Sequence, residues 1–244
     1  MGASTSDVFY VYTSGFFCYS VDMPYRSIPL ATGEYYHVYN RGVAQQPVYL
    51  LKKDYQRFLL SLEFYLHKDY PFKLSNLLQL SDDVRGSVLS ELVKKNNKFV
   101  EITAFCLMPN HFHLLLQQKT EGGISKFMKL ITDSYTRYFN TRHDRVGPLF
   151  QGQFKAVHVS KNEQLVHLSR YIHLNPLVSF VVRDEKFLNY PWSSLGFYSK
   201  KEQGMVEPDI VLGQFRSARQ YLKFVLDQKD YGRKLEQIKH LVLE

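Results

Sequence analysis

One short stretch limits the possible folds of this chain more than any other, Met108-Pro109-Asn110-His111-Phe112-His113-Leu114-Leu115-Leu116. It opens on turn residues and continues as a half-buried strand. Because the side chains of a strand alternate between the two faces of its sheet, His111 and His113 share one face while Phe112 lies on the other. Two imidazoles on one strand face form half of a metal site, although two polar residues on a half-exposed strand are a common alternative.

Further strands and helices are predicted around this strand. Residues 34–41 alternate around Tyr and Val and end at turn residues, which predicts a first strand. Residues 99–107 and 111–118 are predicted to form a hairpin. Apolar residues at intervals of three and four predict amphipathic helices over residues 52–68 and 122–142. This order predicts an α+β fold with an antiparallel sheet of four to five strands and helices packed on it.

A later segment adds polar groups on a helix predicted over residues 161–174. Tyr171 and Asn175 are four residues apart, so they lie on the same side of this helix, one turn from each other. Proline cannot continue a helix, and the residue before it avoids helical geometry, so we expect the helix to stop at Asn175-Pro176. Asn175 is also typical of a helix C-terminal cap. His173 points elsewhere, and we expect it to pack at the surface.

The overall composition narrows the class of partner. The chain has 244 residues and a formal net charge of +8, which favours a polyanion such as a nucleic acid. Its only cysteines, Cys18 and Cys106, are far apart, which argues against a disulfide framework and a thiolate zinc site. The apolar run over residues 8–19 is interrupted and too short to cross a bilayer, so we expect no membrane role.

Taken together, four ordered motifs resemble the HUH single-tyrosine transposases, and among them most closely the REP-associated tyrosine transposases and related insertion-sequence transposases. The resemblance extends over residues 23–200 and is carried by these segments: Tyr35-Tyr36-His37-Val38-Tyr39-Asn40-Arg41-Gly42, Pro109-Asn110-His111-Phe112-His113, Gly147-Pro148-Leu149-Phe150-Gln151-Gly152 and Tyr171-Ile172-His173-Leu174-Asn175-Pro176.

The resemblance implies a ferredoxin-like HUH endonuclease core that nicks and rejoins single-stranded DNA at hairpin-flanked sites. It implies that Tyr171 is the nucleophile, holding the 5′ end of the cut strand as a phosphotyrosine. It further implies that His111, His113 and Asn175 bind a divalent metal ion. Mixed nitrogen and oxygen ligands suit Mn²⁺ and are acceptable to Mg²⁺.

Single-stranded or hairpin DNA is therefore the expected partner of a monomer or homodimer. The resemblance implies a bacterial, cytoplasmic enzyme that is associated with the nucleoid when bound to DNA. Basic residues near the motifs are expected to contact phosphates, although a solvated surface charge is the default for any one of them. These are Arg41, Lys126, Lys129, Arg142, Arg145, Lys155, Lys161 and Arg170.

Three parts of the chain are expected. Residues 1–22 lie outside the resemblance and are expected to be a disordered or non-native extension, with a natural start at Met23 as one version. Residues 23–200 would form the transposase domain, with a helical insertion at about residues 70–98. Residues 201–244 would add a basic helical C-terminal extension, with a helix over residues 216–228.

Two other functions remain open at this point. One is a catalytically idle protein that binds DNA hairpins for regulation. The other is a metal-dependent phosphodiesterase acting on RNA or DNA, in which the histidines act and Tyr171 is structural. A zinc nucleobase deaminase is disfavoured, because its His-x-Glu and Cys-x-x-Cys pairs are missing from the sequence.

Overall fold

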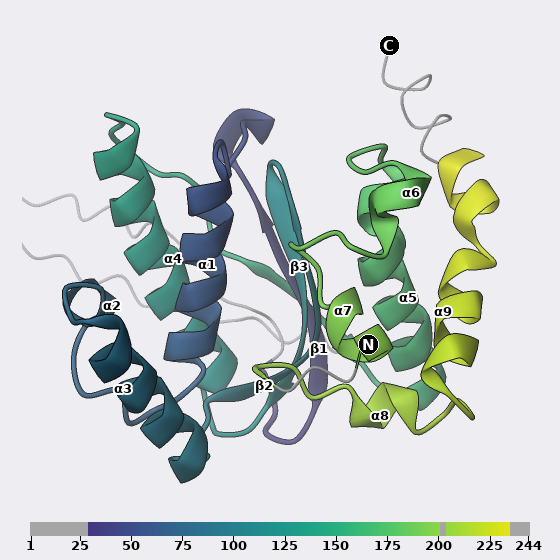
Figure 1. The fold of residues 1–244 in the computed structure, drawn as a ribbon, viewed down its shortest axis with the longest axis horizontal. Coiled ribbons are helices and arrows are strands. Elements are labelled where there is room, and N and C mark those ends of the chain that lie inside the picture. The colour runs from purple at the N-terminus through teal and green to yellow at the C-terminus, as the bar shows by residue number, and fades with distance from the viewer. Residues whose placement is uncertain (1–28, 201–203, 235–244) are drawn as a thin grey trace, which may run out of the picture.

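The computed structural model describes residues 29–200 and 204–234, and Figure 1 shows the arrangement of their elements. The elements in chain order are β1 (Tyr35–Arg41), the 3-10 helix η1 (Val43–Gln45), α1 (Lys52–Tyr65), α2 (Leu74–Leu77), α3 (Asp82–Lys95), β2 (Val100–Met108), β3 (His111–Gln118), α4 (Gly123–Arg142), β4 (Lys155–Val159), α5 (Asn162–Val178), α6 (Asp184–Phe187), α7 (Leu195–Lys200), α8 (Asp209–Leu212) and α9 (Ala218–Leu226).

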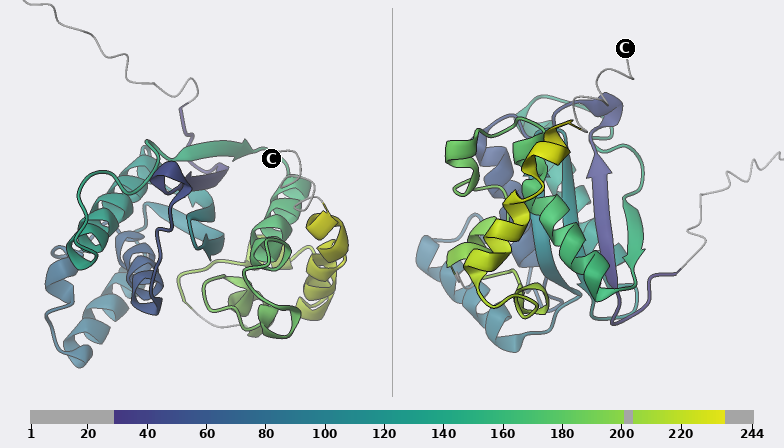
Figure 2. Two further views of the ribbon diagram at one scale, coloured as in Figure 1. Left: turned by 90° about the horizontal axis from the view of Figure 1, so that it is seen from above. Right: turned by 90° about the vertical axis from the view of Figure 1, so that its right-hand side faces the viewer.

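The centre of the fold is a four-stranded sheet with the strand order β2-β3-β1-β4. Every neighbouring pair is antiparallel, and β2 and β3 form the predicted hairpin. Figure 2 shows this sheet between two helical layers, with α1 and α4 on one face and α5 and α9 on the other. The predicted α+β architecture is confirmed, and the number of strands lies within the expected range.

Strand register decides which side chains share a face. Across β1 and β3, Arg41 is opposite His111 and Tyr39 is opposite His113. Across β1 and β4, Tyr39 is also opposite Lys155. Directly opposite residues of an antiparallel ladder point to the same side of the sheet. The face toward α5 therefore collects the histidines together with basic and phenolic side chains.

The opposite face carries the apolar half of the alternation. Phe112 and Leu114 are fully buried there. The ring of Phe112 lies 5.2 Å from that of Phe58 on α1, and Phe58 lies 5.0 Å from Tyr135 on α4, measured between ring centroids. Aromatic pairs at such distances add to the stabilisation from burial itself. This face is the main core of the molecule.

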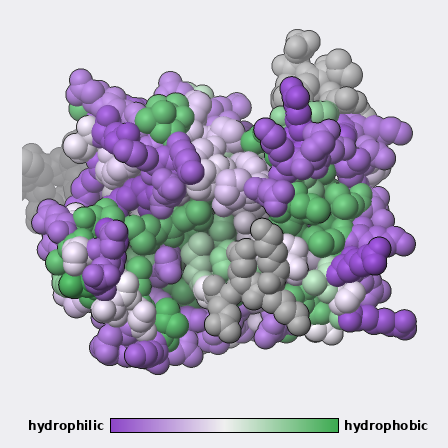
Figure 3. Space-filling view, viewed as in Figure 1, coloured by the Kyte–Doolittle hydropathy of each residue, from purple (hydrophilic) through white to green (hydrophobic). Residues whose placement is uncertain are grey.

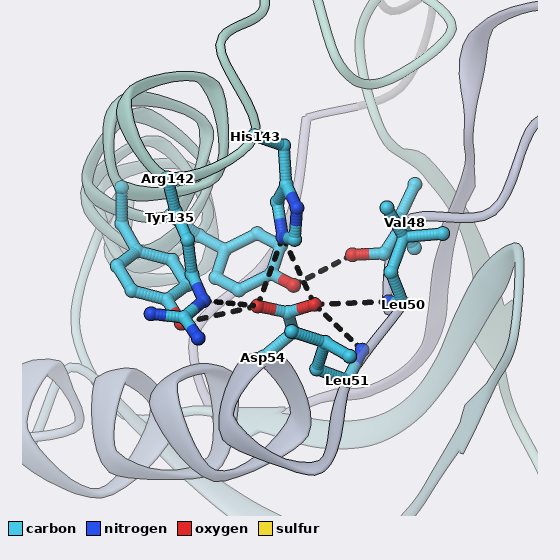
Figure 4. Close-up of polar contacts among 8 residues, drawn as sticks. Val48, Leu50, Leu51, Asp54, Tyr135, Arg142 and His143 are labelled. Carbon is cyan, nitrogen blue, oxygen red and sulfur yellow. Dashed lines mark hydrogen bonds and ion pairs between the residues drawn. The ribbon is translucent and has the colours of Figure 1, made fainter.

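A buried carboxylate fixes the chain at the entrance to α1. Asp54 is fully buried and accepts hydrogen bonds from the backbone N–H groups of Leu50 and Leu51, at 2.9 and 2.8 Å. His143 and Arg142, at the end of α4, lie 3.1 and 3.8 Å from its oxygens (Figure 4). The cluster thereby joins α1 to α4 on the apolar side of the sheet.

The same cluster supports the turn before His111. Tyr135 donates its hydroxyl to the Val48 carbonyl at 2.6 Å, which Figure 4 also shows. The backbone N–H groups of Val48 and Tyr49 donate to the carbonyl of Pro109, in the turn between β2 and β3. The position of the histidine-bearing hairpin is therefore connected through the backbone to the Asp54 cluster.

Helix α5 corrects one prediction. It continues through Pro176 to Val178 instead of stopping at Asn175-Pro176. A proline within a helix costs about 3 kcal/mol, since a hydrogen bond is lost and the ring crowds the preceding turn. The helix continues because all its residues from Ile172 to Leu177 are buried, so tertiary packing outweighs the local preference.

The position of His173 corrects another prediction. Its side chain is fully buried, not packed at the surface. Its Nδ1 lies 2.6 Å from the Tyr221 hydroxyl on α9, and its Nε2 lies 2.7 Å from Ser194 Oγ. Burial lowers the pKa of His173 to about 3, so the imidazole is neutral. Side chains remote in sequence satisfy both nitrogens, which a helical-wheel argument does not reveal.

The remaining elements complete the two layers. The expected insertion forms α2 and α3. The described part of the expected C-terminal extension contributes α8 and α9, of which α9 packs on α5 through Tyr221. In the view of Figure 3, apolar residues gather in a band across the middle and hydrophilic ones cover its margins. The division of the chain at residue 200 stays a prediction. The proposed extension of residues 1–22 lies outside the described residues.

Candidate active site

A pocket of about 620 Å³ opens between the polar face of the sheet and α5. Its lining includes residues of all four sequence motifs, because β1, β3 and β4 contribute to one wall and α5 contributes the other. The lining residues are His37, Tyr39, Asn40, Arg41, His111, His113, Gln151, Lys155, Val157, Leu168 and Tyr171.

The predicted nucleophile lies over the histidines. Tyr171 is 47% exposed, so its phenol is accessible although its helix is packed against the sheet. Its ring meets His113 edge to face at 5.4 Å and His37 at 6.2 Å between centroids. The structure therefore brings together the tyrosine of one motif and the histidines of two others.

His113 is the most enclosed member of the site. It is only 6% exposed, with Nδ1 2.9 Å from His37 Nε2 and Nε2 3.4 Å from Asn175 Nδ2. Burial lowers the pKa of His113 well below its usual value, and the charges of His111, His37 and Arg41 lower it further. The imidazole is therefore neutral near pH 7, which is the state that binds a metal ion.

His111 approaches His113 from the same strand. Their rings are perpendicular, with centroids 4.9 Å apart. Nδ1 of His111 lies 2.7 Å from Asn110 Oδ1, in the turn that precedes the strand. The three predicted metal ligands, His111, His113 and Asn175, therefore lie in one place although they come from two separate motifs.

The side chains of His111, His113 and Asn175 offer two imidazole nitrogens and one amide as possible metal ligands. In the described part of the chain, no group of three or more His, Cys, Asp or Glu side chains could hold a metal ion. A site here consequently depends on the amide of Asn175 as its third donor. Rotating that amide by 180° exchanges Oδ1 and Nδ2, which places an oxygen beside His113 Nε2. Two imidazoles and one amide oxygen then fit Mn²⁺ or Mg²⁺.

Half of the predicted DNA contacts lie on the same side of the sheet as the pocket. Arg41 and Lys155 line the pocket itself, and both are exposed. Lys161 is exposed at the start of α5. Arg170, on α5, stacks over the Phe224 ring at 4.1 Å and lies 2.7 Å from His167 Nδ1.

The other four predicted DNA contacts are carried by α4 and the turn after it, on the far side of the sheet. Lys129 is paired with Asp133 at 2.9 Å, and Arg142 lies beside Asp54. Lys126 lies over the ring of Phe99, and Arg145 donates to the Pro148 carbonyl at 3.1 Å. These four residues do not lie at the candidate site, and their contact with DNA stays a prediction.

The pocket also contains residues for which the sequence had suggested no role. His37, Tyr39 and Gln151 line it, and burial lowers the pKa of His37 to about 4. The sequence pattern that could have indicated His37 and Tyr39 was the alternation of β1, which puts them on one face with Arg41. The missing information was the pairing of β1 with β3.

Comparison with known families supports the class that this fold and site define. Residues 80–175 match the family model described as "Transposase IS200 like". The matched segment contains both histidines of β3, Tyr171 and Asn175. The resemblance to the HUH single-tyrosine transposases is therefore confirmed, and residues 80–175 are similar to the IS200-like transposases.

Among solved structures, the chain is similar to "Structure of the REP associates tyrosine transposase bound to a REP hairpin". The two chains are 16% identical, with a TM-score of 0.47, over 76% of this chain and 88% of the other. No curated protein matches the sequence. None of the helices in residues 29–200 and 204–234 has the length and apolar character needed to span a membrane.

Proposed function

We propose that this protein is a metal-dependent transposase that cuts and rejoins single-stranded DNA at hairpin-flanked sites, with Tyr171 as the nucleophile. The observation that carries the proposal is the position of Tyr171: an accessible phenol, on a firmly packed helix, over His113 and within the pocket that also holds His111. The family match over residues 80–175 supports the same class of reaction.

The cleavage step follows from these groups. The Tyr171 oxygen attacks the scissile phosphorus and loses its proton, while the bond from phosphorus to the 3′ oxygen breaks. That oxygen takes up a proton and leaves as a 3′ hydroxyl, and the 5′ end stays on the enzyme as phosphotyrosine. A divalent ion held by His111, His113 and Asn175 would bind a non-bridging phosphate oxygen and offset the charge of the transition state.

Rejoining is the reverse of this step. A 3′ hydroxyl of another strand attacks the phosphotyrosine, a new phosphodiester forms and the phenol of Tyr171 is restored. Arg41 and Lys155, exposed at the pocket, would hold phosphates on either side of the reacting one. Because the phosphotyrosine conserves the energy of the broken bond, the cycle needs no nucleotide cofactor.

Single-stranded hairpin DNA is the proposed substrate, in line with the net charge of +8. The protein would act as a monomer or homodimer in the bacterial cytoplasm, at the nucleoid when bound to DNA. Residues 23–200 would form the catalytic domain, and residues 201–244 would be an extension that supports hairpin binding.

The test is incubation of the full chain with end-labelled hairpin oligonucleotides, including those that flank the native gene, and Mn²⁺ or Mg²⁺. We expect a protein–DNA adduct that survives a denaturing gel and disappears with a chelator. Hairpin binding without any adduct would favour the regulatory alternative. Cleavage that leaves no adduct and survives Tyr171→Phe would favour the phosphodiesterase.

A further inference from the structure

His37 has no part in the reaction described above, yet it makes the shortest polar contact to the buried ligand candidate. It lies on β1, half-buried, on the sheet face that carries the pocket. Its Nε2 is 2.9 Å from Nδ1 of His113, and the two rings are stacked at 5.1 Å with an angle of 25°. The two stacked rings lie next to Tyr171, whose ring meets both of them edge to face.

A hydrogen bond between two neutral imidazoles has two possible directions. Either His113 donates through Nδ1, or His37 donates through Nε2. The surroundings of His113 distinguish them, because its Nε2 faces the amide of Asn175 at 3.4 Å. In the metal-free protein this amide turns its Nδ2–H donor toward Nε2, so that Nε2 accepts and the proton of His113 lies on Nδ1.

We infer that His37 is a positioning residue: it accepts the Nδ1–H of His113 and so fixes the tautomer and ring orientation in which Nε2 of His113 can bind a divalent metal ion. The inference rests on the proposed function for the identity of the ligand. The direction of the hydrogen bond is a property of the metal-free protein and can be measured by itself.

Because the partner of His113 is an imidazole and not a carboxylate, it adds no negative charge to the site. Metal-binding histidines commonly donate their second nitrogen to a carboxylate, a carbonyl or a water. Among the described residues that line the pocket, there is no Asp or Glu. A neutral imidazole orients His113 without placing a negative charge beside an incoming phosphate, which a carboxylate at this distance would repel. The arrangement suits a polyanionic substrate.

Three variants test the inference. His37→Phe keeps a ring of similar size and removes both nitrogens, whereas His37→Gln keeps an oxygen that can accept from His113 Nδ1. The matched control is His158→Phe on β4, because His158 is exposed and lies on the opposite sheet face, where it contacts Glu34 at 2.8 Å.

The first readout is the tautomer of His113 in the metal-free wild-type protein, from long-range proton–nitrogen NMR spectra assigned with His113→Gln. We expect the proton on Nδ1. A proton on Nε2 would overturn the inference. This measurement needs neither metal nor DNA, so it also decides the matter where the Phe variant fails to fold.

The second readout is Mn²⁺ affinity, from the free-ion signal in electron paramagnetic resonance, alongside thermal unfolding. We expect His37→Phe to weaken Mn²⁺ binding about 10- to 100-fold, His37→Gln to recover most of it, and His158→Phe to match wild type. Unchanged affinity in His37→Phe would overturn the inference. A wild-type protein that binds no Mn²⁺ would instead contradict the metal in the proposed function, while the tautomer spectrum would still decide the role of His37.

Discussion

The two faces of the sheet bury ionisable groups in opposite ways. On the face toward α1 and α4, Asp54 is fully buried and surrounded by donors from two backbone amides, His143 and Tyr138. On the face toward α5, His113 is nearly as buried, but its partners are another imidazole and an amide beside an open pocket. Burial is common to both, and the nature of the partners separates them.

The difference shows how one sheet serves two purposes. The donors around Asp54 leave it no room for a ligand, so the cluster stabilises the connection between α1 and α4. Burial keeps His113 neutral, and its partners hold it at the wall of a pocket. Because β1 and β3 alternate, the residues of the packed face and of the pocket follow one another along the same strands. Substitutions on the two faces should therefore have separable effects.

The largest effect is expected for Tyr171→Phe. Removing the proposed nucleophile should reduce adduct formation by on the order of 10⁴-fold or more, with hairpin affinity and the unfolding free energy near those of wild type. The matched variant is Tyr39→Phe, since Tyr39 lines the same pocket. Timed adduct assays on both variants check the expectation. Full activity of Tyr171→Phe together with loss in Tyr39→Phe would reverse the assignment.

Asp54→Asn should act mainly on the packed face, because the bonds from Val48 and Tyr49 that hold the Pro109 turn do not involve the Asp54 side chain. The change removes a charge that several donors stabilise, and we expect the unfolding free energy to fall by about 2–4 kcal/mol. Urea denaturation measures the loss, and Mn²⁺ affinity serves as the control on the other face. A stable variant that loses Mn²⁺ binding would contradict the separation of the two faces.

The effect of Asp54 should also depend on pH. Burial raises the pKa of Asp54, but hydrogen bonds from Leu51, His143, Leu50 and Tyr138 outweigh it, so that the net shift is downward. A lowered folded pKa contributes stability above the unfolded pKa of about 3.9, and this is lost as the pH falls through the folded value. The stability difference between wild type and Asp54→Asn should therefore be largest near pH 7 and shrink below about pH 4. A difference that grows on acidification would refute this account.

A smaller effect is expected for Tyr221→Phe, which removes the hydroxyl between α9 and α5. The hydroxyl contacts His173 Nδ1 at 2.6 Å and Ser169 Oγ at 3.1 Å, so its loss leaves the buried His173 Nδ1 without this partner. We expect the unfolding free energy to fall by about 1–3 kcal/mol. Because α5 carries Tyr171, adduct formation should fall as well, though far less than in Tyr171→Phe. Stability equal to wild type would contradict the role of this network.

The smallest effect is expected for single basic residues, and it compares the two faces most directly. Lys155→Ala, at the pocket, should weaken hairpin binding about 3- to 10-fold and lower the salt slope by about one. Lys129→Ala, on α4 and paired with Asp133, should leave both unchanged. Binding titrations at several salt concentrations measure both quantities. Equal losses in the two variants would extend the DNA surface to the α4 side.

Several of these features followed from local patterns. Strand alternation predicted that His111 and His113 share a face, and helix periodicity predicted that Tyr171 and Asn175 share a side. Other features depended on partners remote in sequence. Burial of α5 carries the helix through Pro176, and His173 is buried because Ser194 and Tyr221 satisfy it.

For His37, one part of its role could be predicted from a local pattern and another part could not. Its position within an alternating strand was evident from the sequence, and so was its place in the first motif. Its contact with His113 depends on how β1 pairs with β3, where His37 is opposite Leu115 and Tyr39 is opposite His113. A register shifted by one residue would turn the whole set away from the pocket.

The measurement that tests the central claim most directly is peptide mass mapping of the adduct formed with hairpin DNA and Mn²⁺. We predict that the modified peptide carries the nucleotide on Tyr171, on the α5 side of the sheet. Modification of Tyr39 or of a tyrosine outside the pocket would contradict the assignment of the nucleophile, and with it the mechanism built on this face.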